Sequence, residues 1–264
     1  MSHGDKYVLD TSILFENISQ DNGTVLKKLS DNGITRRYHL NHCLIEFRLG
    51  LLQNWIGFYL DVLATQDIPG AKRRLGKRIN FQPRQGSNYM LLDGLLSEIC
   101  GRLEAGTPAL FLPQIEECIS YAQTSLKLLS GKIVGSNDDH HILRPEFIAV
   151  DDYEEFHRRC KEDYVVDLSE IFATKRSRFV ELVDYLKSLP LKGKEKKLAE
   201  SMIKLIEQGL ADVSKVNLKT QNRRYGDIVI AMDTTSNYRI LSSDNSFKLL
   251  CGGLKKNFLD YKDL

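Results

Sequence analysis

Short apolar runs followed by acidic or polar residues occur near both ends of the chain. Lys6–Leu9 is such a run and predicts a buried strand, with Asp10 at its carboxyl end and a helix beginning just after it. Residues 37–40 predict a second strand, and Asn41 is a suitable N-cap for a helix that continues past Trp55. Between these strands we expect a helix interrupted at Gly23 and a turn at residues 31–33.

The middle of the chain has a different pattern. From about residue 69 to residue 220, apolar residues recur at three- and four-residue spacing, which is typical of amphipathic helices. We expect helices over 89–104, 113–129, 151–163, 168–189 and 194–209. Residues 73–87 and 131–145 are expected to be loops, and either 147–150 or 164–167 is expected to be a strand.

Short apolar runs return after residue 224. Ile228–Met232 predicts a short buried helix capped by Asp227, and residues 238–241 and 257–261 predict strands. A helix that starts at Ser246 is expected to stop at residues 251–253, Cys-Gly-Gly. Short strands alternating with helices predict an α/β fold with a central parallel sheet.

The composition is that of an ordinary globular protein. Of the 264 residues, 27% are charged and 42% hydrophobic, with a net charge of +2, which argues against a disordered chain, a fibre or a disulfide scaffold. No run of 18 apolar residues predicts a membrane span, and the first residues lack the apolar stretch of a signal peptide. The five cysteines are scattered without a Cys-x-x-Cys pair, which argues against structural zinc and favours a cytoplasmic protein.

Four carboxylates stand out by their positions. Asp10 and Asp244 each follow a predicted strand, so in a parallel sheet both would lie at the same edge. Asp227 precedes the second of these strands, and Glu46 lies early in the helix after residues 37–40. Such a cluster would raise its own pKa values by repulsion, and a hard cation, Mg²⁺ or Mn²⁺, would neutralise it. Each acid taken alone also has a structural interpretation, as a helix cap, a turn residue or part of a solvated helix face.

These four residues lie in segments that resemble the acidic motifs of the PIN-domain nucleases. The segments occur in the expected order, with Asp227 and Asp244 only 17 positions apart; they are Tyr7–Ser12, Leu44–Gly50, Asp227–Ala231 and Leu241–Phe247. The resemblance covers residues 1–50 and 222–264, which would form a discontinuous nuclease core. Residues 51–221 would complete that core and carry a mainly helical insertion of unknown role.

The resemblance implies a three-layer α/β/α fold and a metal-dependent endonuclease acting on RNA. Asp10, Glu46, Asp227 and Asp244 would be both the catalytic residues and the metal ligands, and Asp233 is either a further ligand or a helix-end residue. Products with 5′-phosphate and 3′-hydroxyl ends are expected. Two alternatives stay open, a PIN-like binding module with little or no catalysis and a DNA- or flap-directed nuclease.

Other sites are less well supported by the sequence. An Asp-x-Asp phosphatase motif fails at Ser12, an Asp-x-Ser-x-Ser metal site fails at Leu14, and there is no phosphate-binding Gly-x-x-x-x-Gly-Lys loop. We expect His39 and His42 to be structural or surface residues, and residues 138–141, Asp-Asp-His-His, to be an ordinary loop. A hydroxyl among Thr11, Ser12, Ser242 and Ser243 is expected to hydrogen-bond a carboxylate or a metal-bound water.

Basic residues cluster in two segments that could hold a nucleic-acid backbone. One is 71–78, and the other is 192–224, where nine bases against four acids give a local charge of +5. The candidate contacts are Lys72, Arg73, Arg74, Lys77, Arg78, Arg223 and Arg224. For a charge run taken alone, a solvated helix face together with a basic loop is the favoured interpretation. The insertion suggests a protein partner, as for a toxin or defence nuclease restrained by a second protein, and a homo-oligomer stays open.

Overall fold

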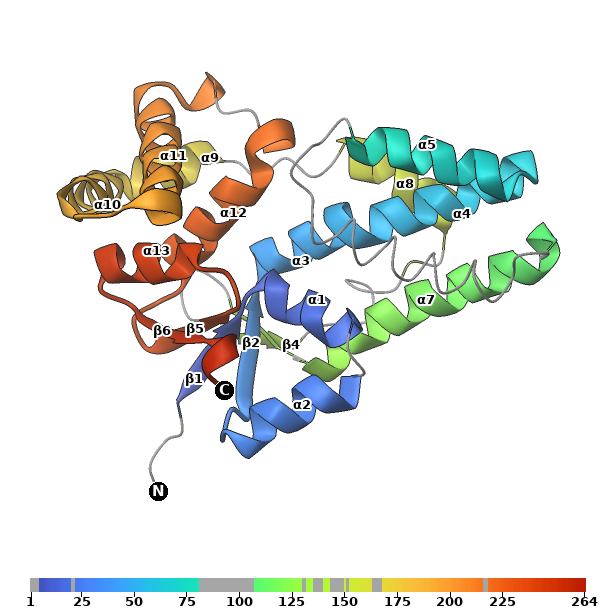
Figure 1. The fold of residues 1–264 in the computed structure, drawn as a ribbon, viewed down its shortest axis with the longest axis horizontal. Helices are drawn as coiled ribbons and strands as arrows, with labels where there is room; N and C mark the ends of the chain where they lie inside the picture. The colour runs from blue at the N-terminus through green and yellow to red at the C-terminus, as the bar shows by residue number, and fades with distance from the viewer. Residues whose placement is uncertain are drawn as a thin grey trace.

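The fold is organised around a β-sheet whose strands come from distant parts of the chain (Figure 1). The computed structural model describes residues 5–19, 22–80, 107–129, 132–134, 140–142, 150, 152–162, 168–215 and 218–264. The strand order is β4-β3-β2-β1-β5-β6, and among these described strands only β4, at one edge, is antiparallel to its neighbour. The strands are Lys6–Leu9 (β1), Arg36–Leu40 (β2), Lys132–Val134 (β3), His140–Ile142 (β4), Tyr238–Ser242 (β5) and Asn257–Asp260 (β6). The predicted α/β fold with a parallel central sheet is confirmed.

Helices cover both faces of the sheet. Because successive side chains of a strand point to opposite faces, Tyr7 and Leu9 of β1 pack in one buried cluster and Val8 packs in another. The first cluster joins the sheet to helices α1 (Thr11–Ser19), α2 (Asn22–Asp31) and α7 (Pro108–Leu129). The second joins it to α9 (Leu168–Thr174), α10 (Arg176–Ser188), α11 (Gly193–Ala211), α12 (Leu218–Asp233) and α13 (Ser246–Leu254).

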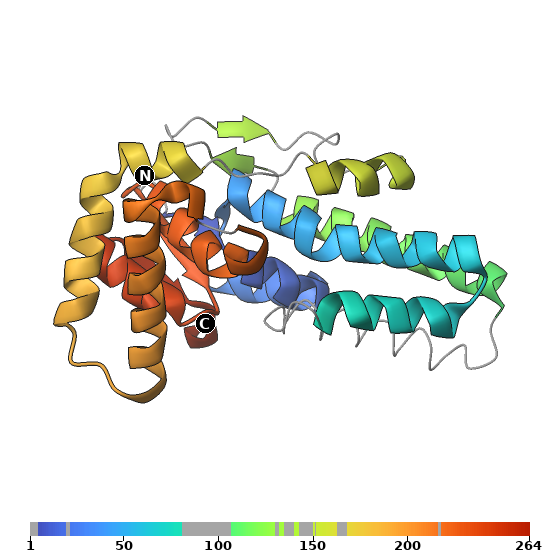
Figure 2. The ribbon, with the colours of Figure 1, turned by 90° about the horizontal axis from the view of Figure 1, so that it is seen from above.

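One long helical path connects the sheet to a group of helices beyond it. Helix α3 (Asn41–Phe47) continues through a π-helical segment, Arg48–Leu52, into α4 (Gln53–Thr65). Helix α4 packs with α5 (Ile68–Asn80), α7 and α8 (Tyr153–Glu162), and we call these four helices the helical arm. Edge-to-face aromatic pairs join its helices, with ring centroids 5.9 Å apart for Phe58–Phe111 and 5.1 Å for Tyr59–Tyr153. Figure 2 shows the arm on the opposite side of the sheet from α10 and α11.

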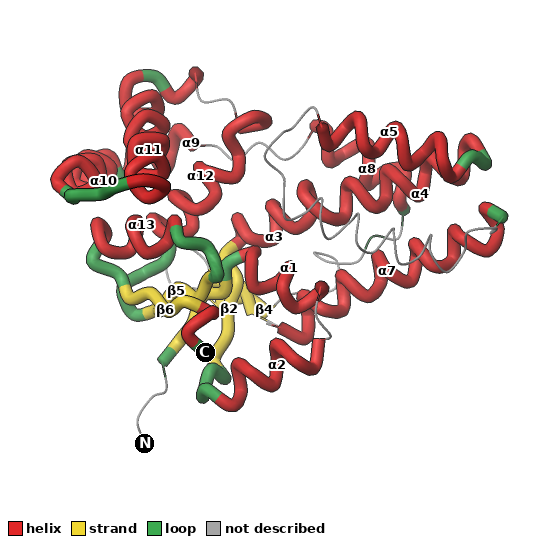
Figure 3. The backbone as a smooth tube through the Cα atoms, viewed as in Figure 1, coloured by secondary structure: helices red, strands yellow, loops and turns green. Residues whose placement is uncertain are grey.

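Residues 51–221 therefore supply several parts of the molecule. They contribute β3 and β4 to the sheet, the helical arm from α4 onward, and helices α9 to α11, which lie over one face of the sheet. Figure 3 shows that helices dominate this part of the chain.

Several sequence-based predictions in this region were wrong. Residues 73–80, expected to be a loop, belong to α5, because Lys, Arg and Leu are good helix formers and Leu75 is buried. The expected loop at 131–145 contains β3 and β4, whose backbone groups pair with β2 and with each other. The expected helix at 89–104 and the candidate strand at 164–167 lie outside the described residues, as does 147–150 except for Val150.

Two helices near the carboxyl terminus also differ from their predicted limits. Helix α12 begins at Leu218, so Asp227 lies in its interior and does not cap it. Helix α13 continues through Gly252 and Gly253 to Leu254 and ends with Lys255 in the left-handed conformation. A Cβ atom on Gly253 would lie 2.5 Å from Leu182 Cδ1 of α10. The glycine thus permits close helix packing there and does not end the helix.

Candidate carboxylate site

Asp10 lies at the carboxyl end of β1 and is almost completely buried, with 4% of its surface exposed. The strand places it beside β5, since Leu9 pairs with Leu241 and the Asp10 amide donates to the Leu241 carbonyl at 3.0 Å. The Ser242 hydroxyl donates to Asp10 Oδ2 at 2.8 Å. Burial, together with the nearby charge of Glu46, raises the pKa of Asp10 from 3.8 to about 6.

Glu46 approaches Asp10 from helix α3. The hydroxyl of Thr11, at the start of α1, donates to Glu46 Oε2 at 2.5 Å. One turn earlier in α3, the ring of His42 places Nε2 at 3.4 Å from Glu46 Oε1. Only 16% of the Glu46 side chain is exposed, so the Thr11 hydroxyl holds a carboxylate that is largely shielded from water, with the His42 ring beside it.

Asp227 enters the site from the interior of α12. The Ser246 hydroxyl, at the start of α13, donates to Asp227 Oδ2 at 2.7 Å. Burial raises the pKa of Asp227 well above its usual value, and repulsion by Asp10, Asp244 and Glu46 raises it further. Asp227 thus lies within the electrostatic influence of all three other predicted ligands.

Asp244 lies in the turn between β5 and α13 and is exposed to solvent. Its carboxylate accepts a hydrogen bond from the Ser246 amide at 2.9 Å, and its own amide donates to the Ser242 hydroxyl at 2.9 Å. The same two serines therefore hold Asp244, the buried Asp10 and the partly buried Asp227. The sequence signal for Ser246 is its place at the start of a predicted helix.

The structure thus places Asp10, Glu46 and Asp244 close enough to Asp227 for their charges to raise its pKa. Within the described side chains, however, no group of three or more His, Cys, Asp or Glu residues is gathered tightly enough to hold a metal ion. No described lysine or arginine side chain forms an ion pair with Asp10, Asp227 or Asp244. The donor chemistry of carboxylate and hydroxyl oxygens matches Mg²⁺ or Mn²⁺, but the site would have to contract to enclose one.

Hydroxyl groups bond two of the four carboxylates, and the two histidines near them are buried. The expected hydroxyl–carboxylate bonds are confirmed by Thr11 on Glu46 and Ser242 on Asp10, and Ser12 Oγ lies 3.2 Å from Ser242 Oγ. His39 is completely buried in β2, with Nδ1 at 3.3 Å from the Leu9 carbonyl oxygen. Burial lowers its pKa from 6.5 to about 4, so it is neutral near pH 7. Both histidines are buried, and neither is a surface residue.

The candidate basic residues lie on two helices, α5 and α12. Lys72, Arg73 and Arg74 lie on α5 in the helical arm, where Arg73 is 3.9 Å from Asp67 and Arg74 is 3.8 Å from Asp61. Arg223 and Arg224 lie on α12, within one turn of Asp227. The side chains of Lys77, Arg78, Arg223 and Arg224 are outside the part of the chain that the structure describes.

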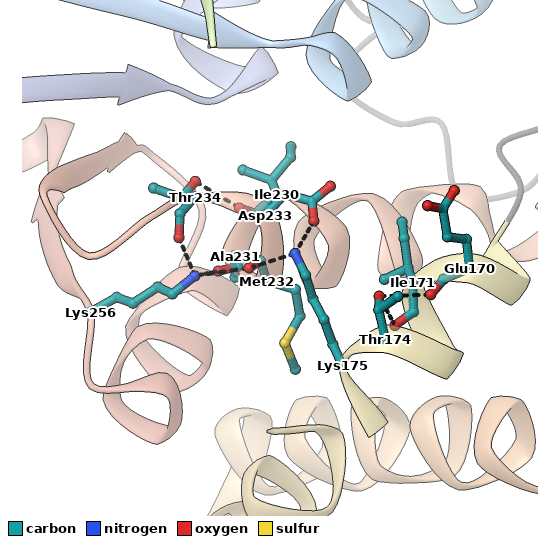
Figure 4. A network of polar contacts seen from close by, with 10 residues as sticks. All are labelled: Glu170, Ile171, Thr174, Lys175, Ile230, Ala231, Met232, Asp233, Thr234 and Lys256. Carbon is teal, nitrogen blue, oxygen red and sulfur yellow. Dashed lines mark hydrogen bonds and ion pairs between the residues drawn. The ribbon is translucent and has the colours of Figure 1, made fainter. Parts of the chain in front are cut away.

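Asp233, which the sequence left undecided between metal ligand and helix end, forms an ion pair with Lys175 at the end of α12 (Figure 4). Lys175 also donates to the Met232 carbonyl at 3.2 Å. The buried Lys256 donates to the carbonyl oxygens of Ala231, Met232 and Thr234. These are orphan acceptors of a helix carboxyl terminus, where positive charge is favourable. Burial, with Arg178 and Lys175 nearby, lowers the pKa of Lys256 to about 8.

Replacing Lys256 by Met is expected to destabilise the protein by about 2 kcal/mol, because the three carbonyl oxygens would lose their buried donor. Urea unfolding at pH 7 measures the effect. The neighbouring exposed Lys255 provides the control, since Lys255→Met is expected to change stability by less than about 0.5 kcal/mol. Equal effects of the two substitutions would contradict this role of Lys256.

Comparisons with protein-family models, with curated proteins and with solved structures found no match for this chain. The PIN-like resemblance therefore stays a prediction from four short motifs. Among the described helices, none combines the length and the apolar content needed to cross a bilayer.

Proposed function

We propose that the protein is a PIN-like, metal-dependent endonuclease that hydrolyses phosphodiester bonds in RNA. The observation that carries this proposal is that acidic side chains gather around Asp227 and raise its pKa. Among the described side chains, no lysine or arginine forms an ion pair with Asp10, Asp227 or Asp244 to offset this repulsion. Buried acids with strongly raised pKa values are frequent at functional sites, because catalysis and ligand binding require groups whose pKa values are shifted by burial and like charges.

Asp10, Glu46, Asp227 and Asp244 would hold one or more Mg²⁺ or Mn²⁺ ions. Such an ion supplies an activated water and stabilises the charge that develops on the phosphate. The chain's own part is to orient the ligands: Thr11 fixes Glu46, Ser242 fixes Asp10, and Ser246 fixes Asp227. No side chain needs to act as a nucleophile.

Arg223 and Arg224, which lie close to Asp227 in the sequence, are the proposed contacts to the nucleic-acid backbone, with Lys72, Arg73, Arg74, Lys77 and Arg78 as a second group. RNA is preferred over DNA because RNA is the usual substrate of the family that the motifs resemble.

Divalent cations are expected to stabilise the purified protein in a pH-dependent way. A saturating concentration of Mn²⁺ should raise the melting temperature by about 5 °C or more at pH 8. The increase should be much smaller at pH 5, because Asp10, with a pKa of about 6, is then largely protonated. Asp184→Asn, an exposed acid on α10, is the control and should keep the full increase. A shift that is equal at both pH values would contradict the assignment.

Cleavage is tested with labelled single-stranded RNA and DNA of the same sequence, with Mg²⁺ or Mn²⁺ and with EDTA. EDTA-sensitive cleavage of RNA by the isolated chain is the expected result. Cleavage of DNA but not of RNA would show that the protein is a DNA-directed nuclease instead. A protein that neither cleaves nor responds to metal would overturn the nuclease proposal in favour of a binding module.

A further inference from the structure

Helix α12 packs against helix α3 beside the carboxylates, and Gly226 faces α3 at this contact. An ideal Cβ atom on Gly226 would lie 2.0 Å from Glu46 Oε1, 3.1 Å from Glu46 Cδ and 3.0 Å from His42 Nε2. The distance to Glu46 Oε1 is shorter than real Cβ atoms show, and the other two are tighter than most Cβ contacts. The Glu46 carboxylate therefore occupies the space that any other residue type at position 226 would fill.

The neighbouring residue prevents α12 from turning to avoid this contact. Tyr225 is 1% exposed, its hydroxyl donates to the Leu205 carbonyl at 2.6 Å, and its ring packs edge-on against Phe172. Tyr225 and Phe172 belong to the buried cluster that joins the sheet to α9–α13. These contacts fix the rotation of α12 about its own axis. With the rotation fixed, position 226 must face α3.

We propose that Gly226 is a positioning residue for the carboxylate site, a role that rests on the proposed metal-dependent function. Its missing side chain lets the Glu46 carboxylate lie against α12, beside Asp227, which follows in the chain. Thr11 donates to Glu46 from α1 and the His42 ring lies beside it on α3, so the carboxylate is enclosed between α1, α3 and α12.

A methyl group at position 226 would displace a side chain but would not unfold the protein. All three of the atoms it would meet belong to side chains, and two of them lie at the flexible end of Glu46. Alanine is also a better helix former than glycine, so α12 itself would not be weakened. The expected effect of Gly226→Ala is a rotated Glu46 carboxylate in an otherwise intact fold.

The test measures Mn²⁺ affinity by calorimetry for the full chain. Gly226→Ala is expected to bind Mn²⁺ about 10- to 100-fold more weakly than the wild type, with its melting temperature unchanged or slightly raised. Gly70→Ala is a matched control, because its Cβ atom would lie 1.9 Å from Asp67 Oδ2, a similar clash with a carboxylate in the helical arm. This control is expected to keep the wild-type affinity.

A shorter acid at position 46 distinguishes positioning from a general structural effect. Glu46→Asp alone should weaken Mn²⁺ binding, but combined with Gly226→Ala it should cost nothing further or recover affinity, since the shorter side chain avoids the methyl group. Losses that simply multiply, or a strongly lowered melting temperature of Gly226→Ala, would overturn the inference.

The crystal structure of Gly226→Ala decides the point independently of metal binding. A displaced Glu46 carboxylate supports the inference, and one in its wild-type place overturns it. Absence of Mn²⁺ binding and of cleavage in the wild type would instead count against the proposed function, so the two failures are distinguishable.

Discussion

Asp10→Asn is expected to abolish Mn²⁺-dependent cleavage and, at the same time, to stabilise the metal-free protein above pH 6. The folded protein holds the Asp10 proton up to a pKa of about 6, whereas the unfolded chain loses it near 3.8. As the pH rises through this window, the folded state binds more protons than the unfolded state, so stability falls. The shift corresponds to about 3 kcal/mol, which the neutral amide would recover in full only at pH values above 6.

Urea unfolding of wild type and Asp10→Asn at pH 3.5 and pH 8 tests this expectation in EDTA. The two proteins should be nearly equal at pH 3.5, where Asp10 is protonated in the folded state, and Asn should be the more stable at pH 8. Asp184→Asn should show no such difference. Full cleavage activity in Asp10→Asn would refute the catalytic role, and a loss of stability at pH 8 would refute the electrostatic argument.

His39→Gln is expected to remove a large acid-sensitive part of the stability. Burial lowers the pKa of His39 from 6.5 to about 4, so its stabilising contribution is complete above pH 6.5 and is lost as the pH falls towards 4. The full window corresponds to about 3 kcal/mol. Glutamine does not titrate and can still donate to the Leu9 carbonyl oxygen, which is 3.3 Å from His39 Nδ1.

The measurement is the difference in unfolding free energy between wild type and His39→Gln at pH 7.5, 6, 5 and 4. This difference isolates His39, because Asp10 titrates in the same range with the opposite sign and partly masks the effect in the wild type alone. The advantage of the wild type should shrink steadily below pH 6.5. Parallel curves for the two proteins would show that His39 is not kept neutral by the fold.

The central elements of the fold follow from local patterns. The apolar run Lys6–Leu9 is β1 with unchanged limits, and Tyr238–Leu241 lies within β5. The prediction that Asp10 and Asp244 share one sheet edge needed only that the preceding strands be parallel, which the pairing of Leu9 with Leu241 confirms. Short apolar runs with polar ends specify buried strands strongly, since such a run has few other ways to bury its side chains.

Strands β3 and β4 and the end of helix α13 depend on contacts with residues distant in the sequence, which local patterns do not reveal. Strands β3 and β4 are only three residues long and gain their backbone partners from β2 and from each other, so composition alone suggested a loop. Gly252 and Gly253 resembled a helix stop, but α10 packs against them and α13 continues.

The sequence therefore sufficed for the α/β class, for the strands of the sheet centre and for the choice of four acids as one candidate site. The folded chain was needed to show that Asp233 pairs with Lys175, that Lys256 caps α12, and that Gly226 makes room for Glu46. The reason is physical: strand and helix patterns depend on neighbours within a few residues, whereas these contacts join residues 22 to 180 positions apart and exist only once the layers have packed.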